Sequence, residues 1–535
     1  MIRMLFFLLL LGGLSSLSAQ STEIQPLLTS DAKVRELAAT ITAEDMRRHL
    51  TILADDAMEG RETGQPGQKR AARYLQEQFE NLGLPTIGEN DGYFQTILFT
   101  RQKWQDINLT LDGEPLRHLT EYASAPSQNA DRGTTRIDEL LFLGYGIDDP
   151  AYSDYAGKDV SGRHLLIFAG EPKDRDGNYR ISGTGEASAW SASDEQKLTI
   201  AKEKGAATVF VIDPNFRENV RNIRQETLDG RMRMAETTEA DRATANVVYL
   251  TPQTARKLMG KAGKKVIKSR KKLEKSGNLK AVTVPVNLTL TQTKTVKELV
   301  GENVLGFVEG VDPKLKDEVL VVSAHYDHIG KRGSSVFNGA DDNGSGTTTI
   351  LEVAEAFVTA KKQGEGPRRS VLFLLVSGEE KGLLGSKYYA NHPIFPLEKT
   401  IADINVDMVG RVDEEHADNP EYIYVIGSDR LSTELHDINE AVNEKYTQLE
   451  LDYTYNAEDD PKRYYYRSDH YNFAVKGIPS IFYFNGTHAD YHQATDTVEK
   501  INFEKMETIG RLVFHTAWQL SNQDRRIAVD VPQED

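Results

Sequence analysis

Five short motifs in the second half of the chain carry His and carboxylate side chains, which are good ligands for divalent metal ions. Most of these motifs directly follow a hydrophobic run that is typical of a buried strand. Any one of them has a plainer structural explanation, but five at corresponding positions indicate one site. The chemistry that they predict is hydrolysis at two metal ions. The candidate residues are His325, Asp327, Asp341, Glu379, Glu380, Asp407 and His492.

The first motif, Ser323-Ala-His325-Tyr-Asp327-His328, ends an apolar segment. His325 and Asp327 are two residues apart, so their side chains leave the same side of an extended chain. A carboxylate that accepts the second ring N–H of a ligating histidine fixes its tautomer and orientation. We therefore expect His325 to bind metal and Asp327 to assist catalysis by orienting it. His328 is expected to be a structural or rim residue.

The second motif is a Gly-rich turn at 338–346 that contains the adjacent carboxylates Asp341 and Asp342. Two cations about 3.5 Å apart need a bridging carboxylate. We expect Asp341 to be this bridge, and Asp342 or Ser345 to help cap the following helix. Taken alone, this sequence is also ordinary turn chemistry.

The adjacent glutamates Glu379 and Glu380 follow an apolar strand and precede a helix. One can ligate metal while the other moves a proton from the attacking water to the leaving amine. An exposed acidic pair at a helix N-terminus is the alternative. Asp407 ends another strand, and His492 follows the last strand after a short loop. All candidate ligands thus lie at carboxyl ends of strands, where open α/β sheets bind their ligands.

The elements that must position these residues form an alternating pattern from residue 318 onward. Apolar strands joined by helices predict an α/β fold, in which a mainly parallel, mixed sheet is covered by helices on both faces. Two further helices are predicted within 41–84. The predicted strands are 319–323, 371–376, 401–406, 422–426 and 480–484, and the predicted helices are 344–361, 383–391, 432–446 and 503–520.

The middle of the chain has a different texture, with short strands separated by turns. We expect it to be a mostly β domain inserted into the catalytic domain. The predicted boundaries place the N-terminal part of the catalytic domain at 20–136, the insert at 137–297, the part with the metal site at 298–525 and a C-terminal tail at 526–535.

Composition limits the function further. The 535 residues include no Cys, so any metal must be held by His and carboxylate. The net charge of −17 disfavours nucleic acid and anionic membranes as partners. The basic segment 256–280 has helical apolar spacing and is expected to be a solvated helix face.

Residues 1–19 predict a secretory signal peptide. They combine Arg3, a short apolar run at 4–11 and small residues up to Ala19, and the run is too short to span a bilayer. No second apolar stretch of spanning length follows in the sequence. We therefore expect a soluble periplasmic or secreted protein.

In order and spacing, the motifs resemble those of the dinuclear zinc peptidases of the bacterial aminopeptidase and glutamate carboxypeptidase type, known as clan MH. The resemblance implies a phosphorylase/hydrolase-like fold and two Zn²⁺ ions. It implies Glu379 as general base and a cis peptide between Asp341 and Asp342. One zinc would bind His325, Asp341 and Asp407, and the other would bind Asp341, Glu380 and His492.

The resemblance extends beyond the motifs. Residues 53–61 resemble the opening of the same catalytic domain, and 144–147 with 154–157 resemble a protease-associated domain. Tyr466 and Asp469, which precede the last ligand, are candidates for binding substrate.

The expected activity is an aminopeptidase acting on peptides. A carboxypeptidase or dipeptidase on the same scaffold is the main alternative and would need a cation such as Arg467 for the substrate carboxylate. A glutaminyl cyclase is disfavoured by the full ligand set. A catalytically inactive binding protein and a metal scavenger are disfavoured by Glu379.

Overall fold

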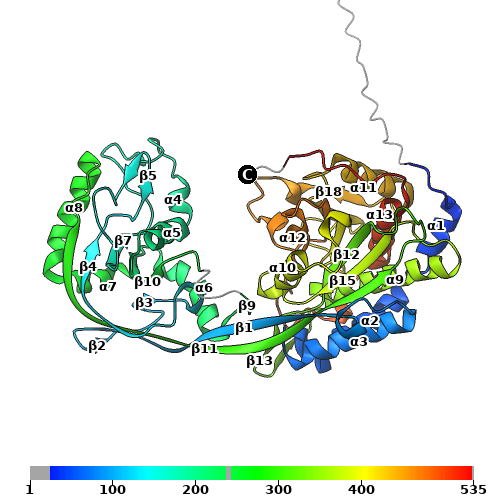
Figure 1. The fold of residues 1–535 in the computed structure, drawn as a ribbon, viewed down its shortest axis with the longest axis horizontal. Coiled ribbons are helices and arrows are strands. Elements are labelled where there is room, and N and C mark those ends of the chain that lie inside the picture. The colour runs from blue at the N-terminus through cyan, green and yellow to red at the C-terminus, as the bar shows by residue number, and fades with distance from the viewer. Residues whose placement is uncertain (1–24, 237–241, 533–535) are drawn as a thin grey trace, which may run out of the picture. The chain divides into compact units, whose positions relative to one another are not determined.

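The computed structural model describes residues 25–236 and 242–532, except for the side chain of Asn222. The predicted signal peptide therefore lies outside the described residues. The chain forms two compact units (Figure 1). Unit 1 comprises the residues up to Thr96 and from Gly301 onward, and unit 2 is Ile97–Val300.

The sheet of unit 1 has the strand order β18-β17-β19-β16-β12-β15-β11. All neighbours are parallel except β11 with β15 and β17 with β19. This mixed, mainly parallel sheet confirms the predicted fold class. The strands are β11 (Val282–Val308), β12 (Val319–His325), β15 (Ser370–Val376), β16 (Thr400–Val406), β17 (Tyr422–Ile426), β18 (Glu450–Asp452) and β19 (Ser480–Phe484).

The central strands are apolar along their whole length because helices cover both faces of the sheet. Every residue of β12, β15, β16 and β19 is buried. One face packs against α1 (Asp31–Ala38), α2 (Ala43–Leu53), α3 (Pro66–Leu82), α9 (Gly346–Lys362), α11 (Thr433–Tyr446) and α13 (Phe503–Asn522). The other face packs against α10 (Leu384–Asn391) and α12 (His470–Ala474).

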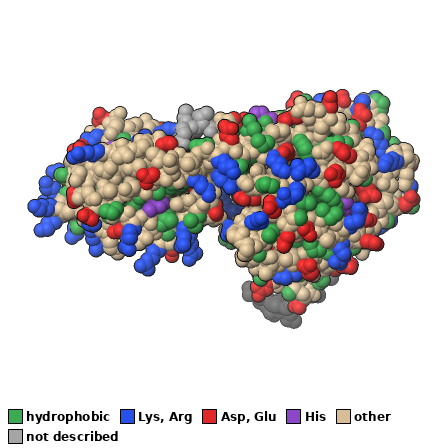
Figure 2. Space-filling view, turned by 90° about the horizontal axis from the view of Figure 1, so that it is seen from below, with side chains coloured by type: hydrophobic (Ala, Val, Ile, Leu, Met, Phe, Trp, Pro, Cys, Tyr) green, Lys and Arg blue, Asp and Glu red, His purple; other side chains and the backbone are tan. Residues whose placement is uncertain are grey.

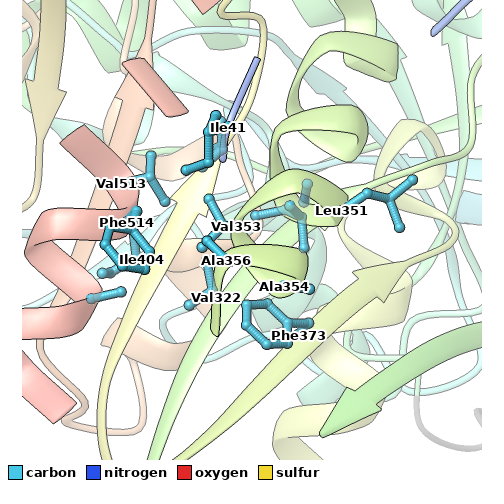
Figure 3. Packing of buried hydrophobic residues seen from close by; sticks show 14 of the residues in the cluster. Ile41, Val322, Leu351, Val353, Ala354, Ala356, Phe373, Ile404, Val513 and Phe514 are labelled. Carbon is cyan, nitrogen blue, oxygen red and sulfur yellow. The ribbon is translucent and has the colours of Figure 1, made fainter. Parts of the chain in front are cut away.

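Figure 3 shows the core on the first face. Val322 and Phe373 from the sheet belong to one buried core with Val353 of α9 and Phe514 of α13. The ring of Phe357 on α9 meets those of Phe373, Phe514 and Trp518 at centroid distances of 5.3–5.9 Å. Such aromatic packing fixes the helices over the sheet whose strand ends carry the site.

Local signals in the sequence set the helix ends. Thr42 caps α2 by accepting a hydrogen bond from the backbone N–H of Asp45, and Asn502 caps α13 in the same way through Lys505. Helix α3 begins at Pro66 and ends before Gly83, which adopts a left-handed conformation with φ of 78°.

Unit 2 is itself an α/β unit, which differs from the mostly β insert that we predicted. Strands β4, β7, β8 and β10 form its parallel centre. Its strands are β1 (Phe94–Leu111), β2 (Glu114–Pro115), β3 (Tyr122–Ala123), β4 (Gly133–Phe142), β5 (Asp148–Asp149), β6 (Tyr152–Ser153), β7 (His164–Phe168), β8 (Thr208–Ile212), β9 (Arg231–Met234), β10 (Asn246–Leu250) and the first part of β11. Its helices are α4 (Ala189–Ala192), α5 (Glu195–Glu203), α6 (Phe216–Asp229), α7 (Pro252–Met259) and α8 (Gly263–Ser276).

Unit 2 also begins earlier than the predicted insert, at Ile97 rather than 137. Strand β1 joins β11 and β9 in its sheet, although Arg101-Gln-Lys-Trp-Gln-Asp106 in the middle of β1 is polar. A polar strand of this kind lacks the hydrophobic run by which the other strands were recognised.

The basic segment of unit 2 forms helices α7 and α8, whose Leu258 and Val266 are buried. Figure 2 shows Lys and Arg side chains gathered along the left edge of the view, at the end of unit 2 where α8 lies in Figure 1. This arrangement agrees with the predicted solvated helix face. Among the helices of the described residues, none combines the length and hydrophobicity needed to span a bilayer.

Candidate metal centre

The candidate site lies at the carboxyl ends of three neighbouring parallel strands, β16, β12 and β15. His325 is the last residue of β12, Glu379 follows β15 and Asp407 follows β16. His492 follows β19, which is the next strand beyond β16. The strand order therefore brings together residues that are far apart in the sequence.

Asp342 lies at the centre of the site, and its two carboxylate oxygens face different histidines. Oδ1 is 3.5 Å from Nε2 of His325, whereas Oδ2 is 3.1 Å from Nε2 of His492 and 3.7 Å from Nδ1 of His328. Asp342 is 3% exposed. A carboxylate divided in this way between two sets of ligands has the geometry of a bridge between two metal ions.

His325, Asp342 and Asp407 form the first group of candidate ligands. Nε2 of His325 is 3.3 Å from Oδ1 of Asp407. The other ring nitrogen, Nδ1, lies 3.1 Å from the backbone carbonyl of Asp327, which can only accept a hydrogen bond. This contact places the proton on Nδ1 and leaves Nε2 free to ligate. Ser468 orients Asp407 by donating to its Oδ2 over 2.7 Å.

The second group surrounds Oδ2 of Asp342. Oε1 of Glu380 lies 3.3 Å from Nε2 of His492 and 2.9 Å from Nδ1 of His328. Burial alone would lower the pKa of His492, but the carboxylates of Asp342 and Glu380 raise it to about 10. His328, which we expected to be structural, is thus placed among the candidate ligands.

Asp341, the residue that we predicted as the bridge, belongs to neither group. Its side chain is fully buried, its Oδ1 accepts a hydrogen bond from the backbone N–H of Gly410 over 2.7 Å, and its Oδ2 is 3.1 Å from Nε2 of His488. The cis peptide is also one residue later than expected, between Asp342 and Asn343. The central position therefore falls to Asp342.

The turn that carries both aspartates is held from the opposite side by Asp496. Its carboxylate accepts hydrogen bonds of 3.1 Å from the backbone N–H groups of Asp341 and Asp342. Burial raises the pKa of Asp496 to about 6, and the neighbouring Asp341 adds to this effect.

The carboxylate of Asp327 does not orient His325 as we predicted. Its Oδ1 is 3.8 Å from Nδ1 of His325, which is too long for a hydrogen bond. The carboxylate instead accepts hydrogen bonds from Oγ1 of Thr63 over 2.7 Å and from the backbone N–H of Glu379 over 3.2 Å. Asp327 therefore fixes the backbone that carries Glu379.

A buried arginine ties the loops of the site together. Arg61 is 1% exposed, and its guanidinium donates hydrogen bonds of 2.6–2.8 Å to four backbone carbonyls. Burial lowers its pKa to about 10, so the side chain stays charged at neutral pH. Its acceptors are the carbonyls of Leu53, Tyr326, Asn338 and Gly339. Tyr326 follows the candidate ligand His325, and Gly339 lies in the turn that carries Asp342.

A pocket opens onto the first group of ligands and onto Glu379. Part of its wall is apolar, made by Met408, Phe482 and Phe484, and the rest includes Tyr464, Arg467, Thr487 and Tyr491. Burial holds the pKa of Glu379 well above its usual range, with nearby carboxylates adding to this effect and His325 opposing it. The pocket thus combines a potential proton carrier with an apolar surface.

Neither predicted substrate residue lines this pocket. Tyr466 lies in a separate surface cleft, together with Tyr453 and Tyr471. Asp469 is fully buried and accepts a hydrogen bond from Ser386. The sequence argument missed Tyr464, which is two residues before Tyr466 and does line the pocket.

The residues present fit a divalent cation. Several atoms of the second group are buried without a hydrogen-bond partner among the described residues: Nδ1 of His328, Oδ2 of Asp342 and Oε1 of Glu380. Leaving such atoms unsatisfied is costly unless something else binds them. Imidazole nitrogens and carboxylate oxygens without thiolates suit zinc, and also cobalt or manganese.

Comparisons with known proteins support a peptidase relationship. Residues 303–517 match the family model described as Peptidase family M28. A probable leucine aminopeptidase of Trichophyton verrucosum (strain HKI 0517) is 32% identical over 221 residues, covering 40% of this chain and 57% of that protein. Aminopeptidase YwaD of Bacillus subtilis (strain 168) is 27% identical over 304 residues, covering 55% of this chain and 60% of that protein.

The fold is also similar to that of a solved structure, the aminopeptidase from Aneurinibacillus sp. strain AM-1. The TM-score is 0.55 at 20% identity, with 94% of this chain and 100% of that chain covered. This likeness supports the fold. The chain spans 57–60% of the length of the two curated relatives named above.

Proposed function

Because residues 303–517 form a domain of peptidase family M28, we propose that this chain is a zinc aminopeptidase that hydrolyses the N-terminal bond of peptides. The proposal for two ions rests on Asp342, whose two carboxylate oxygens face different groups of ligands. One zinc would be held by His325, Asp342 and Asp407, and the other by Asp342, Glu380 and His492. Bound zinc would supply the Lewis acidity that activates water and polarises the substrate carbonyl.

Glu379 is the proposed general base. It borders the pocket beside the first group of ligands, with Oε2 3.8 Å from Nε2 of His325. Asp327 holds its backbone N–H. Glu379 would take a proton from the attacking water and give it to the amine nitrogen of the leaving peptide.

We propose that the N-terminal residue of the substrate is apolar. Met408, Phe482 and Phe484 line the pocket beside His325 and Glu379, where they could contact an aliphatic side chain. This preference agrees with the relative named as a probable leucine aminopeptidase.

A carboxypeptidase or dipeptidase is the second candidate, and one observation favours it. Arg467 lines the same pocket, where its guanidinium could pair with a substrate carboxylate. The same group could instead bind a backbone carbonyl of a peptide whose N-terminus is held. Product analysis separates the two activities.

The deciding experiment incubates the purified mature protein with peptides that carry free or acetylated N-termini, and follows the products by mass spectrometry. Stepwise loss of N-terminal residues, abolished by acetylation and by a chelator, is expected. Release of C-terminal residues would move the assignment to a carboxypeptidase. Absence of cleavage with metal bound would support a binding protein instead.

We also propose that the protein is exported, on the basis of the signal-like sequence at 1–19. Fractionation of cells that express the full chain tests this. The protein is expected outside the cytoplasm, with an N-terminus shortened by about 20 residues, the length typical of a removed signal.

A further inference from the structure

His328 lies in the second group of ligands without a role in the proposed function. It is fully buried, and both of its ring nitrogens lack a hydrogen-bond partner among the described residues. Its Nδ1 nevertheless lies 2.9 Å from Oε1 of Glu380 and 3.7 Å from Oδ2 of Asp342. A buried imidazole aimed at two carboxylates needs either a proton or a metal ion to be stable there.

His328, Asp342 and Glu380 offer ligand atoms that all lie within 4.8 Å of one another, close enough to hold one metal ion. Nδ1 of His328 lies 2.9 Å from Oε1 of Glu380 and 3.7 Å from Oδ2 of Asp342. Nε2 of His492 lies 3.3 and 3.1 Å from the same two oxygens. Both histidines therefore face the same pair of carboxylate oxygens.

We propose that Nδ1 of His328 is a fourth protein ligand of the second zinc ion, in addition to Asp342, Glu380 and His492. This inference rests on the proposed function, because it assigns a ligand to one of the two ions proposed there. The first group, by contrast, consists of His325, Asp342 and Asp407 among the described residues, and it faces the pocket.

The two positions therefore differ in kind. Zinc sites with four protein ligands are closed and structural, whereas catalytic sites have three and keep one position open for water or substrate. Glu379 lies beside the first group, with Oε2 3.8 Å from Nε2 of His325. We infer that the second group would bind its ion more tightly, and that Glu379 would act as the base on the side of the first group.

The chain holds His328 in this orientation from two sides. Its backbone N–H donates to the carbonyl of Arg61 over 3.3 Å. Gly339, which has φ of +56°, leaves room for the imidazole, because a Cβ at that position would lie 2.5 Å from Cγ and Cδ2 of His328. A larger residue at Gly339 would push the ring away from Glu380 and Asp342.

The first test counts imidazoles in the wild-type protein. Extended X-ray absorption fine structure at the zinc edge of the protein with two zinc ions should give about 1.5 imidazoles per zinc, because His325, His328 and His492 would serve two ions. A value of about 1.0 would overturn the proposal. This measurement needs no variant and therefore does not depend on how a variant folds.

The second test measures zinc affinity by competition with a chelator, using the mature protein. His328→Gln should weaken one of the two sites by more than 100-fold, as should His492→Gln, and should leave the other site filled. His515→Gln removes a buried imidazole of α13 that stacks on Tyr446, and serves as the matched control that keeps both ions. Circular dichroism of the metal-free proteins verifies that each variant is folded.

A smaller effect would assign His328 a different role. A residue that only orients a ligand typically changes metal affinity by about 10–100-fold. A loss of that size, together with about 1.0 imidazole per zinc in the wild-type protein, would mean that His328 holds Glu380 by an ion pair. The proposal would then be wrong. If the wild-type protein bound no zinc at all, the proposed function would fail together with it.

Discussion

Glu379 and Glu380 are consecutive residues whose carboxylates face different histidines. Oε2 of Glu379 is 3.8 Å from Nε2 of His325, and Oε1 of Glu380 is 2.9 Å from Nδ1 of His328. Burial would raise the pKa of both, but contacts with His328 and His492 lower the pKa of Glu380 well below its usual range. A carboxyl that readily holds a proton suits proton transfer, and one that stays ionised suits coordination.

Substituting these two residues should separate turnover from metal binding. Glu379→Gln should keep both zinc ions and lower kcat by about 10²–10⁴-fold, because it removes the general base. Glu380→Gln should lose the ion of the second group. Metal content by mass spectrometry and steady-state kinetics on one peptide check both. A Glu379→Gln enzyme that kept most of its kcat would rule out this base.

The two adjacent aspartates provide a matched pair for testing the bridge. Asp342→Asn should remove a ligand from both ions, so that less than one zinc per chain remains after dialysis. Asp341→Asn should keep both ions, because its oxygens contact Gly410 and His488 instead. Zinc-to-protein ratios decide the matter. The opposite result would restore Asp341 as the bridge.

Removing the metal should affect both activity and stability. A chelator should abolish hydrolysis, and added zinc should restore it. Because the ions bind the folded chain, saturation at 100 times Kd adds about 2.7 kcal/mol to the free energy of unfolding. Thermal unfolding with and without chelator measures this difference. An unchanged Tm together with lost activity would indicate a metal that plays no part in holding the fold.

The fold was predictable where a single signal dominates. Strands β17 and β19 begin and end where the sequence predicts, because strands buried on both faces are continuously apolar. The α/β pattern of unit 2 was not predicted, although helix α6 carries Phe216, Val220 and Ile223 at helical spacing. The prediction relied instead on the apolar strands at 208–212 and 247–250 on either side of this helix.

The location of the candidate site followed from strand ends, but the roles of neighbouring residues did not. Asp341 and Asp342 are adjacent in one turn, so the sequence gives no reason to prefer either of them as the bridge. The path of the backbone through the turn decides which carboxylate faces the other ligands. The same holds for Tyr464 and Tyr466, which share one short 3₁₀ turn but line different clefts. His328 lies beyond the end of β12, so strand alternation no longer predicts the direction of its side chain.

Arg61 should be essential for stability. Lysine cannot reach four carbonyls in a fixed fork, so Arg61→Lys should leave buried acceptors unpaired and lower the free energy of unfolding by about 3 kcal/mol or more. Urea unfolding of the metal-free protein measures this without a contribution from zinc. The exposed Arg73 of the neighbouring helix α3 is the control, since Arg73→Lys should change stability little. A loss below 1 kcal/mol at Arg61 would contradict this account.

Glu352 on α9 should make stability depend on pH away from the metal centre. Its side chain is 1% exposed next to His49, and burial raises its pKa from 4.5 to about 8. The folded state therefore binds this proton more tightly than the unfolded state. The stability from this group is full below pH 4.5 and decreases as the pH rises towards 8, by up to about 1.4 kcal/mol per pH unit.

Glu352→Gln should remove this decrease and stabilise the protein most above pH 8, whereas Glu444→Gln, at an exposed position of α11, should not. Chemical denaturation of the metal-free variants between pH 5 and 9 compares them, and parallel curves for wild type and Glu352→Gln would show that Glu352 is ionised in the fold.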